Sequence, residues 1–333
     1  MAPSSRSLPL ITRLVGGSIC AYAPAPDARG VLSPVAVWRP SAGDEAEECA
    51  VPAGLGRACY TTRDAAVCLA EDGAEVWRSE LEPRSDERFG HRPGCAVSVD
   101  GRVLWVYRPD VMAGRGRHDR WVALDAGNGA VLAQADLDTA GHGGEHLVHP
   151  ADDHVLLCVG EGQDGAVVHR ASVTPGRMDL RPYPWPDRVL IDLAPDGSQF
   201  MTVDHGQADF ALHTYPDGKV TLTLSVDAFG DLPEESWVAF SGGYLDQDTV
   251  VVTLARETEE EQEWFRHYRV DSGSGRILGE FDSHAEHPYD IQLLGDGTWL
   301  TRDPSGHPVR RCGAAVAAPE GGQGRSSGGA SVS

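Results

Sequence analysis

A repeated pair of short strands joined by a tight turn is the feature that most constrains how this chain can fold. One form of the pair is centred on aspartates that recur about every 50 residues, at Asp100, Asp153, Asp196, Asp246 and Asp296. A second form lies between them, with turn glycines at Gly73, Gly129, Gly176, Gly218 and Gly275. The flanking runs are β-branched or aromatic, and the turns supply the positive φ that hairpins require. Each repeat is therefore expected to form one four-stranded antiparallel sheet.

Sheets of this size cannot cover both of their faces alone, so the copies must stack, and stacking around an axis leaves only short edges. We predict an all-β fold, a β-propeller with residues 1–312 as a single domain. The expected blades are 18–52, 55–82, 94–138, 145–184, 188–227, 236–282 and 288–312. The last contains only three strands, and the N-terminal segment 8–15 is expected to supply the fourth and close the ring. Because the first two blades are irregular, six blades remain an alternative to seven.

Composition limits the partners and the compartment. The chain has 28 basic and 50 acidic residues, a formal charge of −22, which argues against nucleic-acid or membrane partners. Seven cysteines without a CxxC pair argue against a disulfide framework and a thiolate zinc site. Arg13 interrupts the apolar N-terminal stretch, which is shorter than a secretory signal needs, so we expect a cytoplasmic protein. We also expect the protein to be a monomer. Residues 313–333, rich in Gly, Ala and Ser, are predicted to be a disordered tail.

Two stretches resemble a known superfamily. Residues 121–129, Trp-Val-Ala-Leu-Asp-Ala-Gly-Asn-Gly, and 68–77, ending in Trp77, are similar to the repeats of quinoprotein-like and WD40-like propellers. The resemblance covers about 55–312 and implies the fold rather than a function. Trp77 has no counterpart after the later turn glycines, and no blade ends in Trp-Asp. No quinone cofactor is therefore expected.

Candidate functional residues are those expected at the start of the inner strands. His91, Asp187 and His287 each stand ten residues before a glycine in a turn of the first kind, namely Gly101, Gly197 and Gly297. Glu145 and His146 fall near the same level of another blade. Because equivalent positions of a propeller converge on its channel, these side chains could bind a divalent metal or act as acid and base. The simpler interpretation is that they are solvated loop residues.

Two function classes follow. The first, which we favour, is a binding or scaffold protein that presents a loop-rich face, such as loops 108–120 and 255–264, or the channel mouth to a protein or small-molecule partner. The second is a metal-assisted hydrolase or lyase centred on the five residues named above. The sequence contains no GxSxG elbow, P-loop, GxGxxG after a strand, HExxH or EF-hand loop, so catalysis through those schemes is not expected. A triad assembled from distant positions stays open, and of the two classes we favour a protein that is not an enzyme.

Overall fold

Seven antiparallel sheets arranged in a ring make up the computed structural model, which confirms seven blades rather than six. The structure describes residues 8–25, 28–87, 91–151, 153–174, 176–185, 187–257 and 264–313. The predicted tail after Gly313, and part of the predicted rim loop 255–264, lie outside these residues. No helix in the described part of the chain is long and apolar enough to cross a membrane.

The blades follow one another along the chain, and six of the seven have four strands. Blade one is β1 (Ile11–Val15), β2 (Ser18–Tyr22) and β4 (Ala36–Trp38). Blade two is β5 (Glu48–Ala50), β6 (Arg57–Thr61), β7 (Ala65–Ala70) and β8 (Glu75–Glu80). Blade three is β9 (Gly94–Val97), β10 (Val103–Arg108), β11 (Asp119–Asp125) and β12 (Val131–Leu137). Blade four is β13 (Gly143–Val148), β14 (Val155–Gly160), β15 (Ala166–Thr174) and β16 (Arg177–Pro182).

The remaining three blades complete the circle. Blade five is β17 (Arg188–Leu193), β18 (Gln199–Asp204), β19 (Asp209–Thr214) and β20 (Val220–Ser225). Blade six is β21 (Trp237–Tyr244), β22 (Thr249–Arg256), β23 (Trp264–Asp271) and β24 (Ile277–Phe281). Blade seven is β25 (Gln292–Leu293), β26 (Thr298–Arg302), β27 (Pro308–Cys312) and the N-terminal strand β3 (Gly30–Val31). Two short 3₁₀ helices, Gly162–Asp164 and Val226–Phe229, lie in connections.

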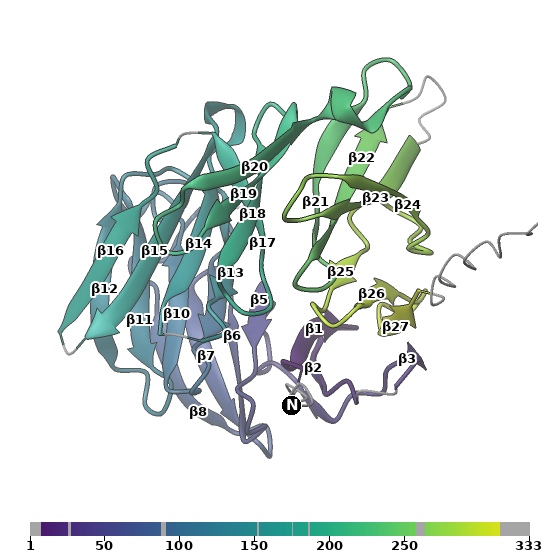
Figure 1. Ribbon diagram of the computed structural model, residues 1–333. Coiled ribbons are helices and arrows are strands. Elements are labelled where there is room, and N and C mark those ends of the chain that lie inside the picture. The colour runs from purple at the N-terminus through teal and green to yellow at the C-terminus, as the bar shows by residue number, and fades with distance from the viewer. Residues whose placement is uncertain are drawn as a thin grey trace, which may run out of the picture.

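An N-terminal strand closes the ring, as predicted, but it is not the segment 8–15. Val31 of β3 pairs with Val309 of β27, so purple β3 meets yellow β27 in Figure 1. The first strand, β1, instead pairs with β2 in blade one. The turn between them is Gly16-Gly17, and both residues have positive φ, at 57° and 75°. Such a two-residue turn commits β1 to the strand that follows it.

The boundary between the first two blades also differs from the prediction. The predicted blade one includes residues 48–50, but they form β5, which pairs with β6 at the start of blade two. Strand β5 has only three residues, too few for an alternating pattern to stand out. The predicted limits of blades three to six lie within about two residues of those in the structure.

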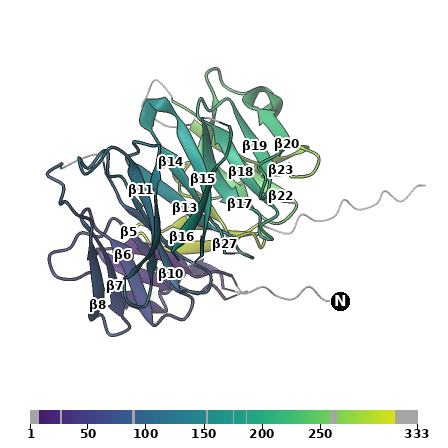
Figure 2. The ribbon, with the colours of Figure 1, turned by 90° about the vertical axis from the view of Figure 1, so that its left-hand side faces the viewer.

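The hydrophobic core is divided among the contacts between neighbouring blades. The described residues form seven buried clusters, and each joins one pair of adjacent blades. The cluster at the seam contains Ile11 and Tyr22 of blade one with Leu300 of blade seven and Leu32 just after β3. The first strands of neighbouring blades contact each other, as in the pairs β5–β9, β9–β13, β17–β21 and β21–β25, and Figure 2 shows the blades from a second side.

Candidate functional site

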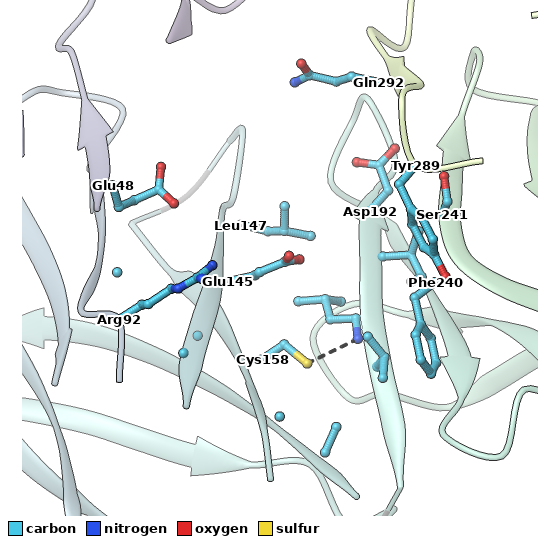
Figure 3. Close-up of a pocket in the computed structure, with 18 of the residues that line it drawn as sticks. Glu48, Arg92, Glu145, Leu147, Cys158, Asp192, Phe240, Ser241, Tyr289 and Gln292 are labelled. Carbon is cyan, nitrogen blue, oxygen red and sulfur yellow. Dashed lines mark hydrogen bonds between the residues drawn. The ribbon is translucent and has the colours of Figure 1, made fainter. Parts of the chain in front are cut away.

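A cavity of about 740 Å³ occupies the centre of the ring. Its walls come from the first strands of blades two, four, five, six and seven and from the residues that lead into β9 of blade three. Figure 3 shows Glu48, Arg92 and Glu145 on one side of this cavity. Asp192, Ser241 and Tyr289 lie on the opposite side, and Gln292 lies at one end of the view. Six blades thus each contribute at least one polar side chain to one central cavity.

Of the five residues predicted to form a channel ring, Glu145 alone lines the cavity. His146 follows it in β13, and successive side chains of a strand point to opposite faces. The His146 ring therefore lies between blades, where its Nε2 accepts a hydrogen bond of 3.1 Å from the indole of Trp121. Burial lowers the pKa of His146 to about 3, so this ring is neutral.

The other three predicted residues lie at separate places around the ring. His91 is buried, and desolvation together with Arg115 lowers its pKa, while the next residue, Arg92, is the one that lines the cavity. Asp187 is exposed and has a positive φ of 61°. His287 is exposed, with its ring 5.4 Å from that of Tyr289, which does line the cavity. Among the described residues no group of three or more His, Cys, Asp or Glu side chains could hold a metal ion.

Asp192 is the most perturbed group in the cavity wall. Burial raises its pKa from 3.8 to about 7, although its carboxylate accepts two backbone hydrogen bonds. The donors are the N–H groups of Leu193 and Tyr244, each at 2.8 Å. An aspartate with this pKa changes its charge near neutral pH, where carboxylates are normally always ionised.

Two local irregularities of the strands build the Asp192 position. The pairing of β17 with β18 shifts between Leu190 and Asp192, and that of β21 with β22 shifts between Val238 and Gly242. Gly243 then lies against the carboxylate, because a Cβ at Gly243 would be 2.3 Å from Asp192 Oδ2. Its φ of +137° is a conformation that other residues rarely adopt. The glycine is required both for this backbone and for the approach of the aspartate.

Glu48 and Glu145 form a second acidic group on the opposite wall. Solvent in the cavity reaches both side chains, yet the surrounding protein desolvates them and raises the pKa of each. Repulsion from Glu145 raises the pKa of Glu48 further, whereas Arg13 acts in the opposite direction. The two carboxylates therefore repel each other, and Arg13 only partly offsets this repulsion.

A basic residue, Arg92 of blade three, lines the cavity, and Arg13 of blade one contacts its lining residue Gln292. Arg13 of β1 donates a hydrogen bond to the side chain of Gln292, and burial lowers the pKa of Arg13. The Arg92 side chain makes no hydrogen bond or ion pair to any described residue, and the same is true of Glu145. Opposite charges without protein partners thus face one polar space.

Sequence reasoning missed Glu48, Arg92, Asp192 and Gln292. One signal was readable, because Asp192 is the only charged residue inside the apolar run Val-Leu-Ile-Asp-Leu of residues 189–193. Arg92 was missed by one position, since the choice between His91 and Arg92 depends on how the chain enters β9. Glu48 and Gln292 belong to strands of three and two residues, which carry no pattern of their own.

Comparison with known proteins places the chain by its fold. No family model matches the sequence, and no curated protein matches it. Among solved structures it is similar to BamB from Moraxella catarrhalis, with a TM-score of 0.53, 12% identity and coverage of 91% of this chain and 81% of that one. It is also similar to hydrazine synthase from Kuenenia stuttgartiensis, with a TM-score of 0.51, 11% identity and coverage of 77% and 72%.

A third similar structure is the dihydro-heme d1 dehydrogenase NirN, with a TM-score of 0.54, 13% identity and coverage of 90% of this chain and 59% of that one. At such identities the likeness concerns the fold alone. The chain is thus a seven-bladed all-β propeller, the fold that its resemblance to quinoprotein-like and WD40-like repeats implied.

Proposed function

We propose that this propeller is a binding protein that holds a small polar ligand in its central cavity. The observation that carries the proposal is that Arg92 and Glu145 both line the cavity and neither side chain pairs with a described residue. The described residues desolvate Glu145 and offer neither side chain a partner, so a complementary ligand would supply the charge-assisted hydrogen bonds that both lack. A volume of about 740 Å³ also lies within the range of about 300–1,000 Å³ typical of small-molecule sites.

The distribution of groups defines the ligand that would fit. Arg92 offers a fork of donors to a carboxylate or phosphate, while Glu48 and Glu145 offer acceptors to an amine or hydroxyl. Asp192 can donate or accept on the far wall, because its pKa of about 7 makes both protonation states accessible. Leu147, beside Glu145, and Phe240, on the wall of Ser241, supply apolar surface to the cavity. A hydroxylated or zwitterionic compound of low molecular mass would satisfy all three groups.

A ligand screen tests this proposal. The purified protein would be heated with a library of polar metabolites, and compounds that raise the melting temperature would be measured by calorimetry. Arg92→Gln and Glu145→Gln should each weaken binding of a hit by about tenfold or more, the loss of one charge-assisted hydrogen bond. Glu71→Gln, in the exposed β7–β8 turn, is the control and should leave binding unchanged. Hits that bind both cavity variants as tightly as the wild type would refute the cavity as the site.

A second candidate function is acid–base chemistry in the same cavity, as in a hydrolase or lyase. Asp192 favours it, because a general acid or base works best when its pKa is near the working pH. This version rests on Asp192 rather than on His91, His146, Asp187 and His287, which do not gather. Turnover of a bound hit that disappears in Asp192→Asn, with binding retained, would support it. Binding without turnover across neutral pH would leave the binding function alone.

A further inference from the structure

A pair of cysteines far from the cavity wall occupies a special position in blade two. Cys59 on β6 and Cys68 on β7 lie directly opposite each other in the antiparallel register. At the end of this hairpin the N–H of Thr62 donates to the carbonyl of Ala65 at 2.8 Å. Hydrogen-bonded and non-hydrogen-bonded pairs alternate from that point, which makes Cys59–Cys68 a non-hydrogen-bonded pair.

That position has the geometry that a disulfide needs. In non-hydrogen-bonded pairs the Cα atoms are about 4.5 Å apart and the side chains approach each other most closely. Disulfides join Cα atoms that are about 4.4–6.8 Å apart. Residues directly opposite each other on antiparallel strands have side chains on the same face of the sheet, and both cysteines belong to the same buried cluster. A bond between them requires no change of register.

The surroundings make one thiol of this pair more acidic than its neighbours. Both side chains are fully buried between blades two and three, in a cluster with Trp77 and Cys95. The neighbouring Cys59 thiol and the charge of Arg57 lower the pKa of Cys68 despite this burial. Burial instead raises the pKa of Cys95. Because the thiolate is the reactive form, Cys68 is the nucleophile of the pair and Cys59 is positioned to resolve its oxidation product.

We propose that Cys59 and Cys68 are a redox-active pair that a hydroperoxide converts into a cross-strand disulfide. The Cys68 thiolate attacks one oxygen of hydrogen peroxide and the O–O bond breaks. The departing hydroxide takes up the proton that Cys68 released on ionising and leaves as water, while Cys68 becomes a sulfenic acid. The Cys59 sulfur then attacks the sulfenic sulfur, the S–O bond breaks, and a second water leaves as the S–S bond forms. The two thiols are oxidised by two electrons, and one hydrogen peroxide is reduced to two waters.

This modification is separate from the proposed ligand site. The pair belongs to the middle strands of its sheet, and neither cysteine lines the central cavity. Oxidation therefore links β6 to β7 without altering a cavity side chain. A failure of the ligand screen would leave the disulfide proposal intact, and the reverse also holds.

The sequence around the pair allows a direct test by peptide mapping. Trypsin cuts after Arg57, Arg63 and Arg78, which places Cys59 in peptide 58–63 and Cys68 in peptide 64–78. Folded protein would be treated with hydrogen peroxide, unfolded in N-ethylmaleimide to block remaining thiols, digested and analysed by mass spectrometry. The expected product is peptide 58–63 joined to peptide 64–78, and dithiothreitol should separate the two.

Variants identify the role of each thiol. Cys59→Ala should remove the linked peptides and leave peptide 64–78 with sulfenic or higher oxidation, whereas Cys95→Ala should leave the linked product unchanged. If the linked peptides are absent from oxidised wild type while both cysteines are recovered with the maleimide, the proposal is wrong. A bond from Cys68 to Cys95 or Cys312 would also overturn it. Because the wild type alone gives these answers, the test stands even if a variant fails to fold.

Discussion

Replacing Asp192 with asparagine tests the account of the cavity wall most directly. Burial raises the pKa of this carboxyl from 3.8 to about 7, which at about 1.4 kcal/mol per pKa unit corresponds to about 4 kcal/mol. Because the carboxylate faces the cavity, water there reduces this cost of ionisation to between about 2 and 4 kcal/mol. The folded state holds its proton more tightly than the unfolded state, so ionisation makes wild-type stability fall as pH rises from about 4 to about 7.

An asparagine amide has no proton to lose in this pH range. Asp192→Asn should therefore abolish the fall in stability that ionisation of Asp192 causes. The substitution itself lowers the free energy of unfolding, because the amide loses one backbone hydrogen bond, from Leu193 or Tyr244. That loss does not change with pH. Between about pH 5 and about pH 8 the wild type should lose about 1–3 kcal/mol relative to Asp192→Asn. Urea denaturation of both proteins at several pH values measures the difference, with the exposed Asp231→Asn as control. A difference that stays constant across this range would refute the raised pKa.

Three further perturbations test other parts of the structure. Gly243→Ala should destabilise the fold by at least about 2 kcal/mol more than Gly279→Ala, because both glycines have positive φ but only Gly243 lies against Asp192; thermal unfolding compares them. His169 is buried with neither ring nitrogen bonded to a described residue, and its pKa is lowered from 6.5 to about 4. The unfolded chain takes up this proton first, so stability should fall by up to about 3 kcal/mol as pH drops from about 6.5 to about 4, and His169→Phe should reduce that loss in acid denaturation. Leu32→Ala should cost about 2–5 kcal/mol because it opens a hole in the seam cluster, whereas Val31→Ala at the 58% exposed neighbour should change the free energy of unfolding by less than about 0.5 kcal/mol.

The limits of what the sequence could predict have identifiable physical causes. Blades three to six were predicted closely because their turns carry glycine or aspartate between strands that, apart from β9 and β24, have six or more residues. The short strand β5 and the two-residue strand β3 have no such pattern, and their partners are fixed by the closing of the whole ring. The Gly16-Gly17 turn was a readable signal for pairing β1 with β2.

The candidate site shows the same division. Glu145 could be predicted because its level in the blade follows from the repeat, and it does line the cavity. Which of two neighbouring residues faces the axis depends on the phase of the pleat, as His146 and Arg92 show. The position of Asp192 depends on irregular pairing in two blades at once, which no pattern within either strand records.

The pairing of β3 with β27 of blade seven also limits the order in which the chain can fold during synthesis. Strand β3 lies between β2 and β4 of blade one along the chain, but its partner is β27 of blade seven. During synthesis blade one can pair β1 with β2 at once, while β3 must wait until blades two to seven have left the ribosome. Joining segments so distant in sequence carries the largest loop-closure entropy of any pairing in the fold. Closing the ring is therefore expected to be the last step of folding, and the seam between blades seven and one the place where a truncated or stalled chain stays open to proteases.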